Sequence, residues 1–174
     1  MPAKRRRDAV IDTCVLVNFL VLNRLDLLSD HPVYRFVLTG HVAAEVSDFY
    51  PEQRRRLNAA LGRKAFRVVT VDALSPLFLE FTRSKRLGAG ESAAIAYAIQ
   101  RRLPLVIDDK RARKSALAAE PTIKLESTVS LVVLALQAGS LTIKQADFMK
   151  EEWESEHRFR LPFDSFAERL EADE

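Results

Sequence analysis

The sequence is poor in cysteine and glycine, and this rules out several kinds of protein. Its one cysteine, Cys14, has no partner for an internal disulfide, so the 174-residue chain has no disulfide framework and suits a reducing compartment. Its five glycines form no P-loop, no Gly-x-Gly-x-x-Gly fingerprint and no Gly-x-Ser-x-Gly elbow, and Gly88-Ala-Gly90 is too short to be one. The common glycine-based motifs for nucleotide binding and nucleophilic catalysis are therefore absent.

Long hydrophobic segments are also missing. The longest apolar run, from Cys14 to Leu22, is interrupted by Asn18 and is shorter than the roughly 18 residues needed to span a bilayer. Basic residues at Lys4–Arg7 precede an apolar segment, but that segment contains Asp12 and has no small-residue cleavage site. We therefore expect no signal peptide, no membrane association and a cytoplasmic location.

The three histidines and the cysteine do not form a recognisable site. His31, His41 and His157 share no metal-ligand spacing with one another or with Cys14. Cys14 directly follows a predicted strand, where a nucleophile could stand, but no histidine lies where the local sequence would place a base. We expect the histidines to be surface or core residues and Cys14 to be a buried thiol.

Composition and charge indicate a soluble globular protein with an uneven charge distribution. The hydrophobic share of 48% and charged share of 29% are typical of such proteins, and 174 residues suit a single domain over 1–174. Residues 1–120 hold 21 Lys and Arg against 13 Asp and Glu, a net charge of +8, whereas residues 121–174 hold 6 against 11, a net charge of −5. A basic body fits a polyanionic ligand, although a solvated charged surface would have a similar composition.

Strand-like and helix-like segments alternate through most of the chain. Short apolar runs predict strands at 9–11, 33–38, 66–71, 104–108 and 122–125, and helical spacing predicts helices at 15–28, 41–49, 52–61, 72–85, 91–102 and 109–118. Such alternation indicates an α/β fold with a parallel sheet covered on both faces. From Thr128 the pattern changes to helices alone, at 129–138, 142–153 and 163–170.

Several carboxylates stand at the junctions between these elements. Asp12 ends the first strand, Glu91 lies in the first turn of its helix, and Asp108 and Asp109 follow the fourth strand. Each has an ordinary structural explanation as a helix cap or as a charge favoured by the helix dipole. Glu45, in an otherwise apolar turn, could be a surface residue. Their joint placement is harder to explain in this way, because three of the sites fall at one edge of the parallel sheet.

Gathered carboxylates repel one another, so keeping them ionised requires a cation or raises one of their pKa values. An all-oxygen site of this kind matches Mg²⁺ or Mn²⁺, which bind substrate phosphate oxygens and can lower the pKa of a bound water. Phosphodiester hydrolysis is the chemistry that these residues suit best.

Four segments together resemble the PIN domain, in particular prokaryotic PIN-like proteins related to VapC-type toxins. In order along residues 7–125 they are Ala9-Val-Ile-Asp-Thr-Cys-Val-Leu-Val-Asn-Phe19, Ala44-Glu-Val46, Gly88-Ala-Gly-Glu-Ser-Ala-Ala-Ile-Ala-Tyr-Ala98 and Leu105-Val-Ile-Asp-Asp-Lys-Arg-Ala-Arg113. The resemblance implies a three-layer α/β/α PIN-like domain with a central parallel sheet, its core at about 7–125, and a helical C-terminal extension at about 126–174.

The resemblance also implies a set of site residues. Asp12, Glu45, Glu91 and Asp109 would form the acidic quartet, with Asp108 as a fifth candidate. The metal ligands would come from Asp12, Glu91, Asp109 and Asp108, supported through hydrogen bonds by Thr13 and Asn18. Many toxins have aspartate in place of Glu91, and their Thr-x-Asp is here Ile107-Asp108-Asp109. Which of the two aspartates faces the metal is left open.

The resemblance implies a Mg²⁺- or Mn²⁺-dependent endoribonuclease, often a homodimer, and in many members the toxin partner of a small antitoxin. We expect Lys110, Arg111 and Arg113 to contact RNA phosphates. The alternative is a catalytically weak or inactive PIN-like module that binds nucleic acid or protein. The apolar residues of the C-terminal extension could dock an antitoxin or a second subunit, or could pack into the core: Leu131, Val132, Leu134, Ala135 and Leu136.

Overall fold

The computed structural model describes residues 5–172, and these residues form one parallel five-stranded sheet. Its strands are β1 (Arg7–Ile11), β2 (Tyr34–Thr39), β3 (Arg67–Val69), β4 (Leu105–Val106) and β5 (Leu125–Glu126). Their order is β3-β2-β1-β4-β5, and every neighbouring pair is parallel. The order reverses between β1 and β4, so the carboxyl ends of these two strands form the topological switch point at which such sheets bind ligands.

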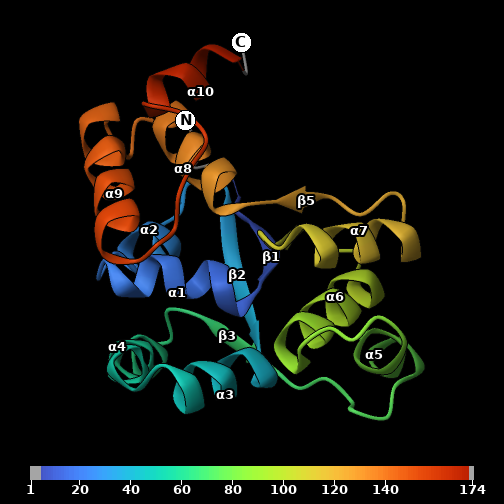
Figure 1. The fold of residues 1–174 in the computed structure, drawn as a ribbon. Coiled ribbons are helices and arrows are strands. Elements are labelled where there is room, and N and C mark those ends of the chain that lie inside the picture. The colour runs from blue at the N-terminus through green and yellow to red at the C-terminus, as the bar shows by residue number, and fades with distance from the viewer. Residues whose placement is uncertain (1–4, 173–174) are drawn as a thin grey trace.

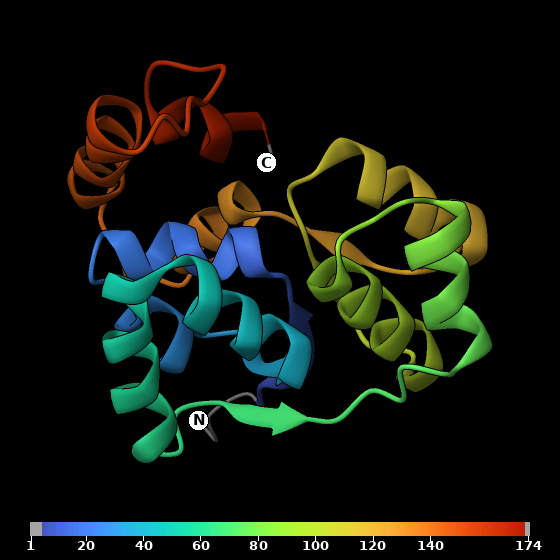
Figure 2. The same ribbon diagram turned by 60° about the horizontal axis from the view of Figure 1, so that its bottom comes forward.

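Helices cover both faces of the sheet, giving the three layers that the sequence predicts (Figure 1). One face packs against α1 (Thr13–Val21), α2 (Asp26–Ser29), α3 (Gly40–Phe49), α4 (Pro51–Gly62), α8 (Thr128–Gln137), α9 (Ile143–Glu156) and α10 (Phe166–Ala172). The other packs against α5 (Pro76–Leu79), α6 (Ala89–Arg101) and α7 (Lys110–Ala119). In Figure 2 the green and yellow helices of the second group stand apart from the blue and orange helices of the first.

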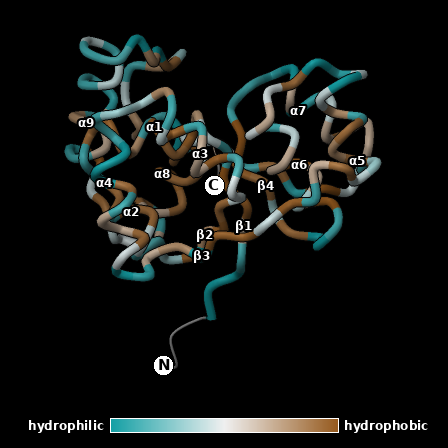
Figure 3. Tube along the Cα trace, turned by 90° about the horizontal axis from the view of Figure 1, so that it is seen from below, coloured by the Kyte–Doolittle hydropathy of each residue, from teal (hydrophilic) through white to brown (hydrophobic). Residues whose placement is uncertain are grey.

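Alternation along the strands divides the core into two clusters. In β1, Ala9 and Ile11 belong to one cluster and Val10 to the other, and in β4 Val106 and Leu105 divide in the same way. A buried parallel strand is apolar throughout because its successive side chains point to opposite, equally buried faces. Figure 3 shows the resulting hydrophobic centre along β1, β2 and β4 and the helices that face them.

Two predicted helices are interrupted in the structure. The helix expected at 15–28 is divided into α1 and α2 by a turn in which Asn23 has a positive φ of 55°. The helix expected at 72–85 begins only at Pro76: Asp72 caps a turn by accepting the Leu74 N–H, and Ser75 is the N-cap. A π-helical turn at Glu80–Ser84 follows. In both places local turn chemistry overrides the helical spacing.

The C-terminal helices are part of the main core. Leu131, Val132, Ala135 and Leu136 of α8 are buried there, and Leu134 is partly buried against it. Trp153 of α9 is fully buried, packs edge-on against Phe19 and donates its indole N–H to the Asn18 carbonyl over 2.7 Å. These apolar side chains therefore pack into the core instead of forming an exposed surface. Within residues 5–172, no helix is both long and apolar enough to cross a membrane.

Candidate active site

A cleft of about 200 Å³ opens at the carboxyl edge of the sheet. It is lined by residues from the end of β1, the start of α1, the C-terminal half of α3 and the N-terminus of α6, namely Asp12, Thr13, Cys14, Glu45, Phe49, Tyr50, Gly88 and Glu91. Three of the predicted acidic residues thus line one cavity although they lie far apart in the sequence. Parallel strands bring this about because their carboxyl ends share an edge.

Asp12 lies at the bottom of the site and is completely buried. It is the N-cap of α1 and its Oδ2 accepts the Cys14 N–H over 3.3 Å, as its position after a strand predicts. Its Oδ1 is buried with no hydrogen-bond partner among the described residues. Burial first, and then repulsion from Glu91 and Glu45, raise the pKa of Asp12 to about 7. A buried carboxylate oxygen with no donor facing it suits a cation.

Glu45 is held by neighbours on both sides of the cleft. Its Oε2 accepts the Thr13 hydroxyl over 2.5 Å and its Oε1 accepts the Gly90 N–H over 2.7 Å. These two hydrogen bonds join α3 to the starts of α1 and α6. Thr13, predicted to support the site, thus donates a hydrogen bond to the Glu45 carboxylate.

Glu91 stands in the first turn of α6 and is half-buried. Its Oε2 accepts the Gly88 N–H over 3.2 Å, which fixes the side chain beside the helix N-terminus. Burial is the largest cause that raises the pKa of Glu91, and the charges of Asp109 and Glu45 raise it further, while the Gly88 N–H and Arg111 oppose them. The negative charge of Asp109 is therefore close enough to Glu91 to disfavour ionisation of its carboxyl.

Asp108 and Asp109 have different surroundings. Both oxygens of Asp108 are engaged: Oδ1 accepts the Thr128 N–H over 2.8 Å, and Oδ2 accepts the Thr128 hydroxyl over 2.6 Å and the Asn18 amide over 3.2 Å. Asp109 is exposed and caps α7 through Oδ1, which accepts the Ala112 N–H over 2.8 Å. Asn18 therefore supports Asp108, whereas Oδ2 of Asp109 has no hydrogen bond within residues 5–172.

The donor set fits a hard divalent cation in its chemistry, although the carboxylates stand apart. Within the described part of the chain, no three Asp, Glu, His or Cys side chains are close enough together to form a metal-binding group as they stand. Asp12 nevertheless offers an unpartnered buried oxygen, and Glu91 lines the same cleft. Oxygen ligands of this kind are those that Mg²⁺ and Mn²⁺ prefer.

Cys14 corrects the prediction of a buried thiol, because its side chain is exposed at the rim of the cleft. The buried face of α1 carries Val15, Leu16 and Phe19, and Cys14 points away from it. The walls of the cleft still shield the thiol from part of the solvent. This partial desolvation and the nearby charges of Asp12 and Glu91 raise the pKa of Cys14 to about 12. The thiol is therefore protonated near neutral pH in the metal-free protein.

The predicted phosphate-binding residues at the start of α7 are not equivalent. Lys110 and Arg111 are exposed, and Arg111 donates to the carbonyls of Lys85 and Arg86. Arg113 is half-buried, and its Nη1 donates to the carbonyls of Ile107 and Glu126 over 2.6 and 2.7 Å. The structure thus gives Arg113 a role in joining the ends of β4 and β5.

Three residues that contribute to the site are not part of any motif that the sequence analysis identified. Phe49 and Tyr50 line the cleft from the end of α3, and Phe49 is 73% exposed. Thr128 holds Asp108 from a position 20 residues further along the chain. Phe49 lies four residues after Glu45, so helical spacing could have placed the two on one face, but only the fold shows that this face lines a carboxylate cleft.

Comparison with known proteins finds a matching family model and solved structures of similar fold. A sequence model described as "PIN domain" matches residues 8–172. A search of curated proteins finds no match. The fold is similar to that of a PilT N-terminus domain protein from the hyperthermophilic archaeon Sulfolobus solfataricus P2, with 19% identity, a TM-score of 0.50 and coverage of 78% of this chain and 94% of that one. A protein from Pyrobaculum aerophilum gives 18% identity, a TM-score of 0.48 and coverage of 79% and 95%. At such identities the likeness concerns the fold alone.

Proposed function

The chain belongs to the PIN domain family, whose members are generally nucleases, and from this premise we propose that it is a divalent-metal-dependent endoribonuclease. The observation that carries the proposal is the carboxylate cleft at the switch point. There Asp12, fully buried and with one unpartnered oxygen, lines the same cavity as Glu45 and Glu91. Such an arrangement is costly unless a cation occupies it, because burial and mutual repulsion both disfavour the ionised form.

Asp12, Glu91 and Asp109 would hold the ion. Asp12 offers Oδ1, Glu91 lines the cleft, and Asp109 has an oxygen that is not used in capping α7. Asp108 is a weaker candidate because Thr128 and Asn18 already occupy both of its oxygens. When bound, Mg²⁺ or Mn²⁺ supplies activation of a water nucleophile and offsets negative charge on the phosphate.

Other residues of this chain position the site and the substrate. Glu45 ties α3 to the starts of α1 and α6 through Thr13 and Gly90, so it keeps the walls of the cleft together. Lys110, exposed at the start of α7, can reach backbone phosphates as the RNA passes Asp109. Phe49 presents an exposed ring at the rim, and aromatic rings bind unpaired bases by stacking. The preferred substrate is therefore RNA with unpaired bases at the cut site.

The test is cleavage of a panel of structured and single-stranded RNAs by the full chain with Mn²⁺ and with EDTA. Cleavage is expected only with the metal, and the Asp12→Asn/Glu91→Gln variant should be inactive. Asp30→Asn/Glu52→Gln is the matched control, because both residues are exposed and lie outside the cleft. Activity that survives EDTA or the first double substitution would sink the mechanism.

A finer part of the proposal is that the enzyme is the toxin of a VapBC-like pair. In this proposal the chain forms a homodimer, and a small antitoxin binds it and inhibits it. The basic body of the chain, with a net charge of +8 over residues 1–120, supports an RNA target. A short reading frame next to this gene, whose product binds the chain and suppresses its cleavage, is the expected finding. Cleavage without any growth defect on expression would leave a nuclease that is not a toxin.

A further inference from the structure

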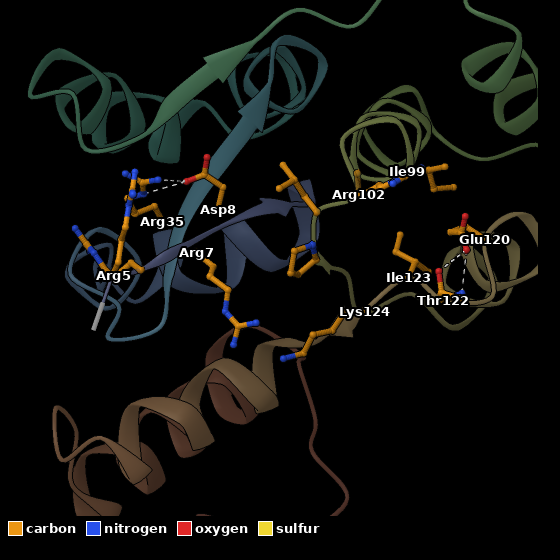
Figure 4. Close-up of a pocket in the computed structure, with 14 residues that line it drawn as sticks. Arg5, Arg7, Asp8, Arg35, Ile99, Arg102, Glu120, Thr122, Ile123 and Lys124 are labelled. Atoms are coloured by element: carbon orange, nitrogen blue, oxygen red, sulfur yellow. Dashed lines mark hydrogen bonds and ion pairs between the residues drawn. The ribbon is translucent and has the colours of Figure 1, made fainter. Parts of the chain in front are cut away.

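A second cavity lies at the opposite edge of the sheet from the carboxylate cleft. Its volume is about 670 Å³, within the range of small-molecule sites. It is lined from the amino-terminal ends of β1, β2, β4 and β5 and from the C-terminal ends of α6 and α7 (Figure 4). Neither Asp12 nor any other residue of the carboxylate cleft contributes to it.

The cavity combines an apolar floor with a cationic rim. The floor consists of Ala98, Ile99, Leu103, Pro104 and Ile123. Six cations line it, Arg5, Arg6, Arg7, Arg35, Arg102 and Lys124, against two acids, Asp8 and Glu120. The charge of Asp8 is already balanced, because it pairs with Arg35 over 2.7 Å and with Arg67 over 3.1 Å. The cavity is therefore positive.

Not all of the cations have a structural partner. Arg6 donates to the Ser29 carbonyl over 2.7 Å, and Lys124 pairs with Glu126 over 3.1 Å. Arg7 and Arg102, in contrast, form no ion pair and no side-chain hydrogen bond within residues 5–172, and both are exposed. Of the described acids that line the cavity, the only one near Arg102 is Glu120, whose pKa is lowered by hydrogen bonds from Thr122 and, to a smaller extent, by the charge of Arg102. Figure 4 shows Arg7, at the start of β1, and Lys124, just before β5, extending toward the same side of the cavity. Gathering like charges without partners is unfavourable, and an anion would offset it.

We propose that this cavity binds a nucleotide, with the base on the apolar floor and the phosphate on Arg7, Arg102 and Lys124. An inorganic anion would leave the apolar floor exposed to water, and an uncharged apolar ligand would leave the arginines unpartnered. Guanidinium groups bind phosphate oxygens in pairs, and the flat face of a base suits a floor of Ile99, Leu103 and Pro104. The nucleotide can be a free metabolite or one unit of an RNA strand, since both present the same base and phosphate.

The proposal does not depend on the nuclease function, so its test uses the full chain with the Asp12→Asn/Glu91→Gln substitutions. Calorimetric titration with ADP, adenosine and inorganic phosphate should give the tightest binding for ADP, by at least 10-fold over either part. Arg7→Gln/Arg102→Asn should weaken ADP at least 10-fold. Arg54→Gln/Arg55→Gln, two exposed arginines of α4 that do not line the cavity, should change it less than 2-fold.

Replacing part of the floor separates the two halves of the site. Ile99→Gln should weaken ADP and leave the affinity for phosphate unchanged. A 5′-phosphorylated pentanucleotide that displaces ADP would identify an RNA strand as the source of the nucleotide, and failure to displace it would identify a free nucleotide. ADP that binds no tighter than phosphate, or that binds equally well to Arg7→Gln/Arg102→Asn, overturns the proposal.

Discussion

The backbone of Gly90 and the carboxylate of Glu45 are in direct contact, 45 positions apart in the sequence. The Gly90 N–H donates to Glu45 Oε1 over 2.7 Å, and a Cβ at residue 90 would lie 2.2 Å from Oε2 and 2.7 Å from the Thr13 hydroxyl. Real Cβ atoms do not approach other atoms so closely. Glycine at this position therefore allows α3 to present its glutamate against the start of α6.

Gly90→Ala should accordingly impair the proposed RNA cleavage without unfolding the protein. Alanine is favoured over glycine in a helix by about 1 kcal/mol, which partly offsets the clash. The Glu45 carboxylate must move, however, so RNA cleavage should fall by about 100-fold, the loss that a displacement of about 1 Å can cause at an active site. Gly62→Ala is the control, since a Cβ there meets nothing within 4 Å. Equal cleavage by the two variants would contradict the positioning role of Gly90.

Asp12→Asn should stabilise the protein in the absence of metal. The pKa of Asp12 is about 7 in the folded state, whereas in the unfolded state it has its ordinary value of about 4. The unfolded state therefore loses its proton first, and the stability of the folded state falls as pH rises from about 4 to 7. Asparagine keeps the cap on α1 and carries no charge. We expect the free energy of unfolding by urea at pH 8 to rise by about 2 kcal/mol, and by much less at pH 4, where wild-type Asp12 is protonated.

Asp30→Asn, which removes an exposed carboxylate, should leave the stability unchanged at both pH values. An Asp12→Asn variant less stable than the wild type at pH 8 would show that the carboxylate is satisfied in the metal-free protein.

Much of the fold could be predicted because it rests on local patterns. The run Ala9–Ile11, ended by Asp12, predicts a buried strand and a cap, and both are observed. The alanines of α6 predict close packing on the sheet, and Ala93, Ala94 and Ala96 are fully buried. The three layers follow from the alternation of strands and helices.

Contacts between distant segments could not be predicted in the same way. Asp108 depends on Asn18, 90 residues before it, and on Thr128, so the sequence gives no reason to separate its role from that of Asp109. Cys14 lies among apolar neighbours, but the start and rotation of α1 place it at the rim of the cleft. The proposed nucleotide cavity is assembled from residues in or next to six elements, and no one of them carries a motif.

Phe49→Ala should weaken the binding of single-stranded RNA. The ring is 73% exposed at the rim of the cleft, and stacking of a base on an aromatic ring contributes about 1–3 kcal/mol, which corresponds to a loss of affinity of about 5-fold to 150-fold. Fluorescence anisotropy with the inactive Asp12→Asn/Glu91→Gln protein measures binding without cleavage. Phe49→Trp should bind as well as the parent.

The control for this prediction is Phe148→Ala, since Phe148 is 66% exposed on α9 and does not line the cleft. Duplex RNA, whose bases are already stacked, should bind the Phe49→Ala variant as it binds the parent. If Phe49→Ala weakens single-stranded and duplex RNA equally, Phe49 does not act by stacking.

His31 should make the stability depend on pH below about 6.5. Its Nδ1 accepts the N–H groups of Val33 and Tyr34 over 3.3 and 3.2 Å, and Nε2 donates to the Leu131 carbonyl over 3.1 Å, so the folded state requires the neutral ring. Burial is the main cause that lowers the pKa of His31, with a smaller contribution from Arg6, while the Leu131 carbonyl and Glu126 oppose it.

Because this pKa is lower in the folded than in the unfolded state, the unfolded state takes up a proton first, and stability falls as pH drops below about 6.5. Urea unfolding at pH 7.5 and 5.5 should show this fall in an Asp12→Asn background, which removes the opposing contribution of Asp12 over the same pH range. The fall should be smaller in His31→Gln and unchanged in His157→Gln, whose histidine is exposed at the end of α9. An identical dependence in all three proteins would contradict the role of His31.

The two adjacent aspartates should separate in a single pair of variants. Asp109→Asn keeps the cap on α7, because the amide oxygen can still accept the Ala112 N–H, but it removes the charge beside Glu91. Asp108→Asn leaves α7 intact but replaces one carboxylate oxygen by an N–H₂ group. This group faces either the Asn18 amide or the Thr128 backbone N–H, and the donor that it faces loses its acceptor.

We expect Asp109→Asn to weaken Mn²⁺ binding at least 10-fold in calorimetry with little change in stability. Asp108→Asn should lower the free energy of unfolding by about 1–3 kcal/mol and change Mn²⁺ affinity by less than about 3-fold. The reverse pattern would make Asp108 the ligand and require Thr128 and Asn18 to release it when the metal binds.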